Sequence, residues 1–247
     1  VSDDTALIRY LVRRHHTTPL EMCELKLHVK LPIFVARQWI RHRTANVNEY
    51  SARYSIMDRE FYLPEPQQLA AQSTTNRQGR GQPLSPEQAA AVLERLRTDA
   101  QRCYDHYEEL LNEDDQGQRR RPEDPQLARE LARMNLTLNF YTQWYWKVDL
   151  HNLLHFLALR SDSHAQYEIR VYAEVIGQLV ERWVPAAWGA FRDYRLEAAS
   201  LSRQELQAVK QLLRGGVVDY AALGMTGREQ REFREKLALE QKEKVKL

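Results

Sequence analysis

The chain has 247 residues, of which 43% are hydrophobic and 28% are charged, and its formal net charge is +2. This composition is ordinary for a globular protein, and so small a net charge gives no reason to expect a nucleic-acid partner. No hydrophobic run approaches the length of a membrane span and no signal-peptide pattern is present, so we expect a cytoplasmic protein with no membrane partner. The first residue is Val rather than Met, which suggests that the natural start of the protein is missing.

The N-terminal part predicts a helix, a strand and a second helix. Residues 7–11 form a short amphipathic patch, and the Thr-Thr-Pro run at 17–19 should end the first helix. Apolar and polar residues then alternate from Cys23 to Leu31, which is typical of a half-buried strand. Pro32 ends this strand and can serve as the first residue of the next helix.

The following segments predict loops, a short strand and one long helix. Residues 44–55 favour a loop, and residues 61–63 favour a short strand before a proline. Residues 72–83 are polar and contain glycine, which is typical of a surface loop. The Ser-Pro-Glu-Gln sequence at 85–88 is a helix start, and the helix should run to about Asn112.

The C-terminal half predicts mostly helices. Residues 126–147 are rich in aromatic residues and suggest a helix, and residues 150–159 are dense in leucine, which implies a buried helix. A cap signal at 160–163 precedes a helix from His164 to Trp183. Charged helices near the C-terminus follow two capping boxes, at Ser202 and Thr226. The fold class is therefore α+β (α/β), with an antiparallel or mixed sheet flanked by long helices.

The segment 37–55 combines several arginines and a histidine with a single acid. Arg41, His42 and Arg43 lie next to one another, and short amide and hydroxyl side chains separate them from Arg53. Guanidinium groups bind phosphate well, and short polar side chains leave backbone N–H groups accessible. The segment therefore predicts an anion site, with a basic surface that binds nucleic acid, or binds nothing, as the alternative.

Arg160 and Arg133 pose the same question on two other predicted helices. A guanidinium that is removed from water is costly unless it meets an anion or a carboxylate. Asp162 or Glu168 could pair with Arg160, and Glu130 could pair with Arg133 three residues later. The sequence leaves both ion pairing and ligand binding open for these two arginines.

Histidine and cysteine spacing gives little support for a metal site. His151 and His155 have the i,i+4 spacing of helical zinc sites, but residue 152 is Asn rather than Glu and no third ligand is evident. We therefore expect no metal, and assign these rings to packing or ligand contacts. Cys23 and Cys103 fall on predicted apolar faces and should be buried, inert thiols.

Residues 41–55, RHRTANVNEYSARYS, closely resemble the signature of the flavin-dependent thymidylate synthases, RHRxxSxxxxSxR. Asn46 stands in place of the first Ser of that signature. Three more segments match the same family, HTTPLEM at 16–22, PIFVARQW at 32–39 and LALRSDSHAQYEIRVYA at 157–173. The resemblance covers roughly residues 1–195, the expected catalytic domain, and leaves residues 196–247 as a helical, charged extension of unknown role.

This resemblance implies an α/β homotetramer whose active sites lie where subunits meet. Enzymes of this family reductively methylate dUMP to dTMP, taking the one-carbon unit from methylenetetrahydrofolate while NADPH reduces bound FAD. They need no cysteine nucleophile, which agrees with the two inert thiols expected here. The alternatives are an inactive family member that binds FAD and nucleotide, and a nucleic-acid-binding module.

The matching positions imply a role for individual residues. Arg160 would lie beside the uracil ring and His16 near the flavin ring and folate, as the catalytic residues. A guanidinium at Arg160 would stabilise negative charge that develops on the pyrimidine during hydride delivery. Asp149 stands where Asn is common in the family. FAD contacts are implied for Ser2, Thr18, Glu21, Arg41, His42, Arg43, Glu49, Asp149, Leu150, His151 and His155. dUMP contacts are implied for Gln38, Trp39, Ile40, Arg41, Glu49, Tyr50, Ser51, Ala52, Arg53, Arg133 and Arg160.

Overall fold

The computed structural model describes residues 4–74, 79–114 and 116–238, so the predicted contact at Ser2 lies outside the described residues. The chain divides into two compact units, Val1–Ala186 and Ala187–Leu247. Within the described ranges, no helix combines the length and the apolar character needed to cross a membrane. The division at residue 195 into a catalytic domain and an extension stays a prediction.

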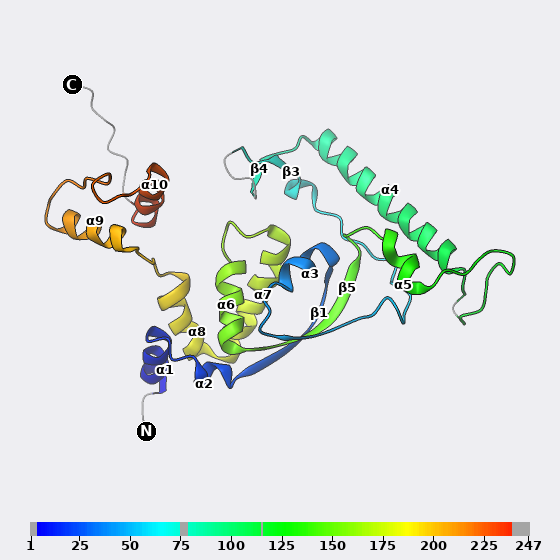
Figure 1. Cartoon of the computed structure of the whole chain (residues 1–247), viewed down its shortest axis with the longest axis horizontal. Coiled ribbons are helices and arrows are strands. Elements are labelled where there is room, and N and C mark those ends of the chain that lie inside the picture. Colours follow the sequence, from blue (N-terminus) through cyan, green and yellow to red (C-terminus); the bar gives the residue numbers. More distant parts are fainter. Residues whose placement is uncertain (1–3, 75–78, 115, 239–247) are drawn as a thin grey trace. The chain divides into compact units, whose positions relative to one another are not determined.

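A three-stranded antiparallel sheet lies in the N-terminal unit (Figure 1). Its strands, in spatial order, are β1 (Glu24–Pro32), β5 (Tyr141–Asp149) and β2 (Asn46–Glu49). β5 pairs with β1 along its whole length, with Glu24 opposite Asp149. The period-two alternation predicted for the first strand is confirmed, because Val29 is buried while its neighbours in sequence are exposed. The expected α+β class is confirmed as well.

The helix predicted over residues 126–147 is wrong. Only α5 (Arg129–Ala132) is α-helical there, a 3-10 turn η2 (Arg133–Asn135) follows it, and the aromatic part is strand β5. Burial within β5 alternates, so that Trp144 and Trp146 face the core, and aromatic residues are favoured in strands. Leu138, an apolar residue of this segment, is 58% exposed. Pairing with β1 and β2 therefore decides the conformation of this segment.

Both loops expected in the first half contain strands. The segment 44–55 includes β2, an edge strand that pairs with β5. Within the segment 72–83, β4 (Arg80–Pro83) pairs with β3 (Ala70–Gln72) in a separate two-stranded sheet. The strand expected at 61–63 is reduced to an isolated bridge between Phe61 and Phe140.

Several helix boundaries also differ from the prediction. A short helix α2 (Thr18–Glu21) follows the Thr-Thr-Pro run, in which Pro19 is tolerated because it lies in the first turn. Pro32 precedes α3 (Ile33–Trp39) as its N-cap instead of being its first residue. Residues 161–165 are turns and bends and Gln166 is the N-cap, so α7 (Tyr167–Trp183) begins three residues later than expected.

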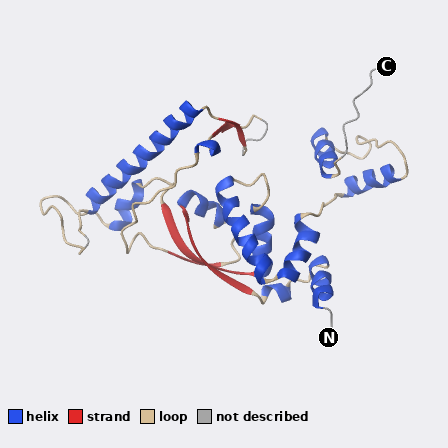
Figure 2. Cartoon of the chain, turned by 180° about the vertical axis from the view of Figure 1, so that it is seen from behind, coloured by secondary structure: helices blue, strands red, loops and turns tan. Residues whose placement is uncertain are grey.

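The first core forms where α3, α6 (Leu150–Arg160) and α7 cover one face of the sheet (Figure 2). Trp39 is 1% exposed and lies edge-on to Trp146, with ring centroids 5.1 Å apart, and against Phe156 at 4.7 Å. Aromatic rings in such tilted arrangements contribute packing energy beyond their buried area. The predicted leucine-rich helix is confirmed as α6.

A second core forms under α4 (Pro86–Leu111), which begins with the predicted capping box at Ser85. The Tyr104 ring stacks on Phe140 with centroids 5.6 Å apart, and Tyr107 lies beside them. This core holds residues from the loop after β2, including Met57, next to residues of α5. It therefore joins segments that are distant in the sequence.

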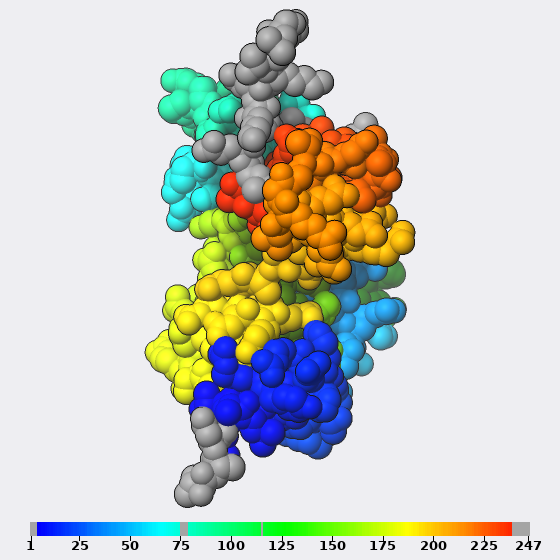
Figure 3. All heavy atoms as spheres, turned by 90° about the vertical axis from the view of Figure 1, so that its left-hand side faces the viewer, coloured from blue at the N-terminus to red at the C-terminus, as the bar shows by residue number. Residues whose placement is uncertain are grey.

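The remaining elements lie near the two termini of the chain, except for one short 3-10 turn in its first half. In the C-terminal unit, both predicted capping boxes are confirmed, and Phe233 belongs to a small separate core. No residue of α1 (Asp4–Arg13) is buried, and residues near the N-terminus lie on the surface in Figure 3. The other elements are η1 (Pro66–Gln68), α8 (Pro185–Phe191), the π-helix η3 (Arg192–Leu196), α9 (Arg203–Leu213) and α10 (Gly227–Lys236).

Candidate active site

A polar pocket of about 340 Å³, which we call the Arg160 pocket, opens beside the first core. The end of α3 delivers the predicted Arg41, His42 and Arg43 to its rim, β5 supplies its floor, and α6 supplies the opposite wall. Arg160 lies in the last turn of α6. Its lining residues are Arg41, His42, Arg43, Thr44, Trp146, Val148, Asn152, His155, Leu159 and Arg160.

Arg160 and His42 form a hydrogen bond in this pocket. The Nε–H of Arg160 donates to Nε2 of His42 over 3.1 Å, so that nitrogen must be unprotonated. Burial, the nearby positive charge of Arg160 and the ring of His155 together lower the pKa of His42 to about 4, and burial is the largest of these causes. Burial also lowers the pKa of Arg160, yet a guanidinium stays charged at neutral pH. Neutral His42 therefore fixes one edge of a charged Arg160.

The carboxylates that could have neutralised Arg160 bind other groups. Asp162 pairs with His164 at 2.9 Å, and Glu168 accepts two hydrogen bonds from Arg80, at 2.6 and 2.7 Å. The alternative that either acid pairs with Arg160 is therefore wrong. Within the described ranges, Arg41 and Arg43 likewise have no ion-pair partner. Three cations without a carboxylate in one pocket suit an anionic ligand.

A second pocket of about 400 Å³, which we call the loop pocket, collects the later part of the basic segment. It is lined by the predicted Glu49, Tyr50, Ser51, Ala52 and Arg133, together with Ile33, Met57, Met134, Leu136, Leu138 and Thr142. The segment 37–55 is thus divided between two pockets that share no lining residue.

Charges in the loop pocket are arranged differently from the sequence expectation. Glu49 accepts a hydrogen bond from the Thr142 hydroxyl at 2.7 Å, which holds its carboxylate against β5. Glu130, the expected partner of Arg133, instead pairs with Arg53 at 2.9 Å. The alternative of an Arg133–Glu130 pair is therefore wrong, and Arg133 has no ion-pair partner within the described ranges.

The other predicted dUMP residues lie around these pockets. Trp39 is buried in the first core, so its side chain packs rather than facing either pocket. Gln38 is half-buried, and its Oε1 atom has no hydrogen-bond partner within the described part of the chain. Ile40 is 45% exposed, and the Tyr50 hydroxyl donates to the backbone carbonyl of Ile56 over 2.7 Å. Roles for these residues stay predictions.

The N-terminal FAD residues are not part of either pocket lining. Thr18 and Glu21 lie on α2, which packs near α6, and His16 is exposed beside the Tyr10 ring, 5.7 Å between centroids. Leu150 is buried, and its N–H donates to the Cys23 carbonyl over 2.7 Å. Of the predicted histidine pair, only His155 lines a pocket, since His151 is half-buried outside both linings.

Asp149 has a structural task at the start of α6. Its carboxylate accepts from the Asn152 backbone N–H at 2.9 Å and from the Asn152 amide at 2.8 Å. Asp and Asn cap helices about equally well, because either side-chain oxygen can accept from the first helical turn. The change from Asn to Asp at this position is therefore compatible with the fold.

The expected burial of the two cysteines is corrected by the structure. Cys23 and Cys103 are half-buried rather than fully buried, and both are free thiols. Across the residues that the structure describes, no three His, Cys, Asp or Glu side chains form a group that could hold a metal ion.

Sequence reasoning missed the strand side of the Arg160 pocket. Trp146 and Val148 line it because they alternate with outward-facing residues on β5, and Asn152 lines it one turn into α6. The Trp-x-Trp-x-Val alternation was the available signal, and assigning this stretch to a helix concealed it.

Comparisons with known proteins give a consistent result. A family model described as thymidylate synthase complementing protein matches residues 1–186. A curated flavin-dependent thymidylate synthase from Ruegeria pomeroyi is 61% identical over 235 residues, 95% of this chain and 75% of that protein. One from Gluconobacter oxydans is 61% identical over 233 residues, 94% of this chain and 74% of that protein. The match to the Ruegeria pomeroyi protein covers so much of the chain that it includes most of the C-terminal unit.

A solved structure of similar fold points in the same direction. It is the UMP/dUMP methylase PolB from Streptomyces cacaoi bound with 5-Br UMP, with a TM-score of 0.69 and 30% identity. The similarity covers 79% of this chain and 84% of that chain.

Proposed function

The chain belongs to the family of flavin-dependent thymidylate synthases, and we propose from this premise that it reductively methylates dUMP to dTMP with FAD as its cofactor. The nucleotide analogue bound to PolB supports a uracil nucleotide as the substrate. Methylenetetrahydrofolate as the one-carbon donor and NADPH as the reductant belong to the same proposal. A cytoplasmic location also belongs to this proposal.

The observation that carries the proposal is the composition of the Arg160 pocket. Arg41 and Arg43 lack carboxylate partners in the described part of the chain, and His42 is neutral, so the pocket offers positive charge to a phosphate-bearing ligand. Trp146 and Leu159 give the same pocket an apolar side for a ring system. These donors fit FAD, although about 340 Å³ lies near the lower end of the ~300–1,000 Å³ usual for ligand pockets. Part of so large a cofactor must therefore extend beyond this pocket.

We assign dUMP to the loop pocket. Arg133 brings to it a guanidinium that has no ion-pair partner among the described residues. Ser51 contributes a hydroxyl, and Arg53 lies two residues further along the loop. A phosphate bound there would pair with at least one of these arginines. At Arg53 it would take the place of the Glu130 carboxylate. The apolar residues Ile33 and Leu136 would border the nucleoside.

Arg160 supplies charge stabilisation in this proposal. When bound, FAD would supply the reducing equivalents of the reaction. The Nε–H of Arg160 is already bound to His42, so its remaining N–H groups are available for the pyrimidine oxygens and ring nitrogen. A fixed guanidinium favours the N3-deprotonated uracil and the charge that develops as C6 accepts hydride. His42 acts as a positioning residue for that guanidinium.

A direct assay tests the proposed function. The purified protein should be yellow, or become yellow with added FAD, and should form dTMP from dUMP with methylenetetrahydrofolate and NADPH. A protein that cannot be loaded with FAD would contradict the proposal, and one that binds FAD and dUMP without forming dTMP would be the inactive member considered above. Strongly salt-dependent binding to a nucleic-acid polymer without flavin would favour the nucleic-acid-binding alternative.

We further propose a homotetramer in which one active site combines the Arg160 pocket of one subunit with the loop pocket of another. The separate linings of the two pockets in one chain support this arrangement. It predicts that Arg133→Ala and Arg160→Ala subunits complement each other. Mixed oligomers from co-expression should regain activity at about one quarter of their sites, because such sites receive both intact arginines.

The complementation is measured as dTMP formation by co-expressed, co-purified subunits. Each variant expressed alone is the control and should stay inactive. No gain of activity in mixed oligomers, shown to be mixed by two different affinity tags, would mean that both arginines of a site come from one subunit.

A further inference from the structure

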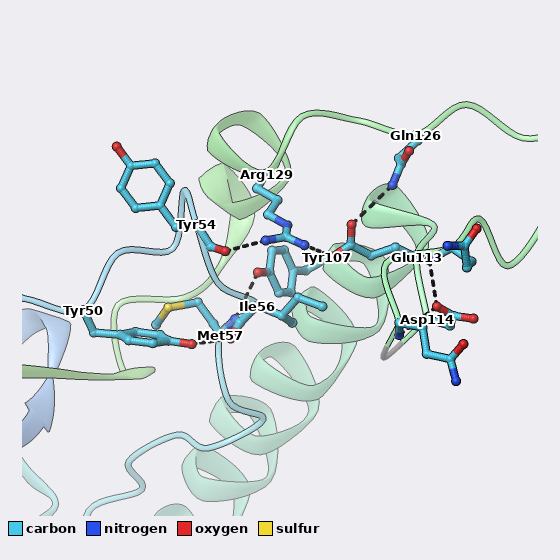
Figure 4. Close-up of polar contacts among 11 residues, drawn as sticks. Tyr50, Tyr54, Ile56, Met57, Tyr107, Glu113, Asp114, Gln126 and Arg129 are labelled. Carbon is cyan, nitrogen blue, oxygen red and sulfur yellow. Dashed lines mark hydrogen bonds and ion pairs between the residues drawn. The ribbon is translucent and has the colours of Figure 1, made fainter.

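Loop 50–57, which lines the loop pocket, is anchored by side chains from other parts of the N-terminal unit (Figure 4). The N–H of Met57 donates to the Tyr107 hydroxyl over 3.1 Å, and its carbonyl accepts from the Tyr104 hydroxyl over 2.6 Å. Both tyrosines are buried in the second core. The end of the loop is thus fixed to α4.

A third anchor is the guanidinium of Arg129, which sits at the start of α5. It donates one hydrogen bond to the backbone carbonyl of Tyr54 and another, of 2.5 Å, to Oε1 of Glu113. Figure 4 shows Arg129 between these two partners. Because one planar group bridges both, the position of Glu113 determines where the middle of the loop lies.

Glu113 is itself held firmly. Its side chain is 7% exposed, and besides Arg129 it accepts a 3.3 Å hydrogen bond from the amide of Gln126. The preceding Asn112 adopts a left-handed backbone, and its amide donates to the carbonyls of Arg121 and Asp124. A buried carboxylate with these partners is costly to move, because moving it would leave a charge without compensation. Glu113 and its hydrogen-bonding neighbours therefore support the loop pocket.

Arg129 does not reach the ligand space. It is absent from the lining of the loop pocket, whereas Arg133, one turn further along the same segment, lines it. The intervening Glu130 pairs with Arg53 at 2.9 Å. Two consecutive residues of α5 thus hold two consecutive residues of the loop, next to the position where Arg133 enters the pocket.

We infer that Arg129, held by the buried Glu113, is a positioning residue for dUMP: it fixes the Tyr54 carbonyl and thereby the spacing between Ser51–Arg53 and Arg133. This inference rests on the assignment of dUMP to the loop pocket. It gives a role to an ion pair that the sequence did not indicate. Neither residue lines the Arg160 pocket or the loop pocket.

The test is a dUMP titration of the FAD-loaded full-length protein by calorimetry, together with KM and kcat. Arg129→Met should weaken dUMP binding and raise its KM by about 10-fold, since displacement of a binding group by a fraction of an ångström is enough for such a loss. FAD content should be unchanged and kcat should change much less than KM. Arg121→Ala is the matched control, because Arg121 makes only an exposed ion pair with Asp124 through its side chain.

A double variant separates positioning from stability. Arg129→Met combined with Glu113→Leu removes both charges, and replacing a buried ion pair with apolar residues often restores stability. The double variant should regain the thermal stability that Arg129→Met loses, yet keep the raised KM, because the Tyr54 carbonyl still has no anchor. Return of KM to the wild-type value together with stability would overturn the inference. Wild-type dUMP affinity in Arg129→Met would also overturn it, whereas wild-type protein that binds no dUMP would overturn the proposed function instead.

Discussion

Replacing Arg160 with alanine should lower kcat for dTMP formation by about 10²- to 10³-fold, with FAD binding and fold retained. Arg160 lies half-buried in the last turn of α6, and among the described residues it has no carboxylate partner. Its guanidinium is held by a hydrogen bond to neutral His42. In the proposed mechanism, loss of the guanidinium removes the group that stabilises negative charge on the pyrimidine. Because that charge develops mainly in the transition state, kcat should fall more than dUMP affinity.

Single-turnover and steady-state measurements with dUMP check this expectation, and the flavin spectrum reports on FAD content. Arg160→Lys should rescue little activity, since an ammonium is a point charge and cannot donate to His42 while presenting a planar pair of N–H groups to the substrate. Arg182→Ala is the control, because this exposed arginine of α7 donates only to the Gln178 carbonyl over 3.2 Å. Turnover of Arg160→Ala within a few-fold of wild type would remove Arg160 from the mechanism.

Acidification should destabilise the wild-type protein more than a His42→Gln variant. Burial and Arg160 hold the pKa of His42 at about 4 in the folded protein, below its ordinary value of 6.5. Between pH 6.5 and 4, His42 is therefore protonated in the unfolded chain but neutral in the folded chain. The free energy of unfolding, which is highest above pH 6.5, consequently decreases as the pH falls towards 4. Since the ring is half exposed, we expect a difference of about 1 kcal/mol between pH 7.5 and 4.5 after allowance for solvent screening.

Urea unfolding followed by tryptophan fluorescence at fixed protein concentration measures this difference. Glutamine keeps an acceptor for Arg160 but does not titrate, so His42→Gln should lack this part of the acid sensitivity. His106→Gln, at an exposed position of α4, should lose stability with acid as the wild type does. Equal acid sensitivity of wild type and His42→Gln would show that the pKa of His42 is not lowered in the folded protein.

The basic segment could be identified from the sequence because its signal is local. Arg41, His42 and Arg43 are adjacent in the chain, and an excess of guanidinium groups over acids is visible without any knowledge of the fold. Strand β1 and helix α6 were predicted for a similar reason, since alternation and leucine density are properties of short windows. Capping boxes at Ser85, Ser202 and Thr226 are also local, and all three are found.

The conformation of residues 141–149 could not be determined from the local sequence alone. Aromatic residues are compatible with a buried helix as well as with a strand, and the choice depends on the hydrogen-bonding partners that β1 and β2 provide. The wrong choice removed Trp146 and Val148 from the expected site.

The sequence by itself determined the family, through a motif whose residues are contiguous, and with it a set of candidate residues for anion binding. Only the tertiary structure decided which of those residues act together. It divided the basic segment between two pockets, paired Arg53 with Glu130 instead of leaving that acid to Arg133, and placed neutral His42 against Arg160. It also assigned Arg129 and Glu113 a supporting position behind the loop. The physical reason is that an ion pair, a shifted pKa or a pocket wall depends on distances between segments far apart in the chain, and those distances exist only after packing.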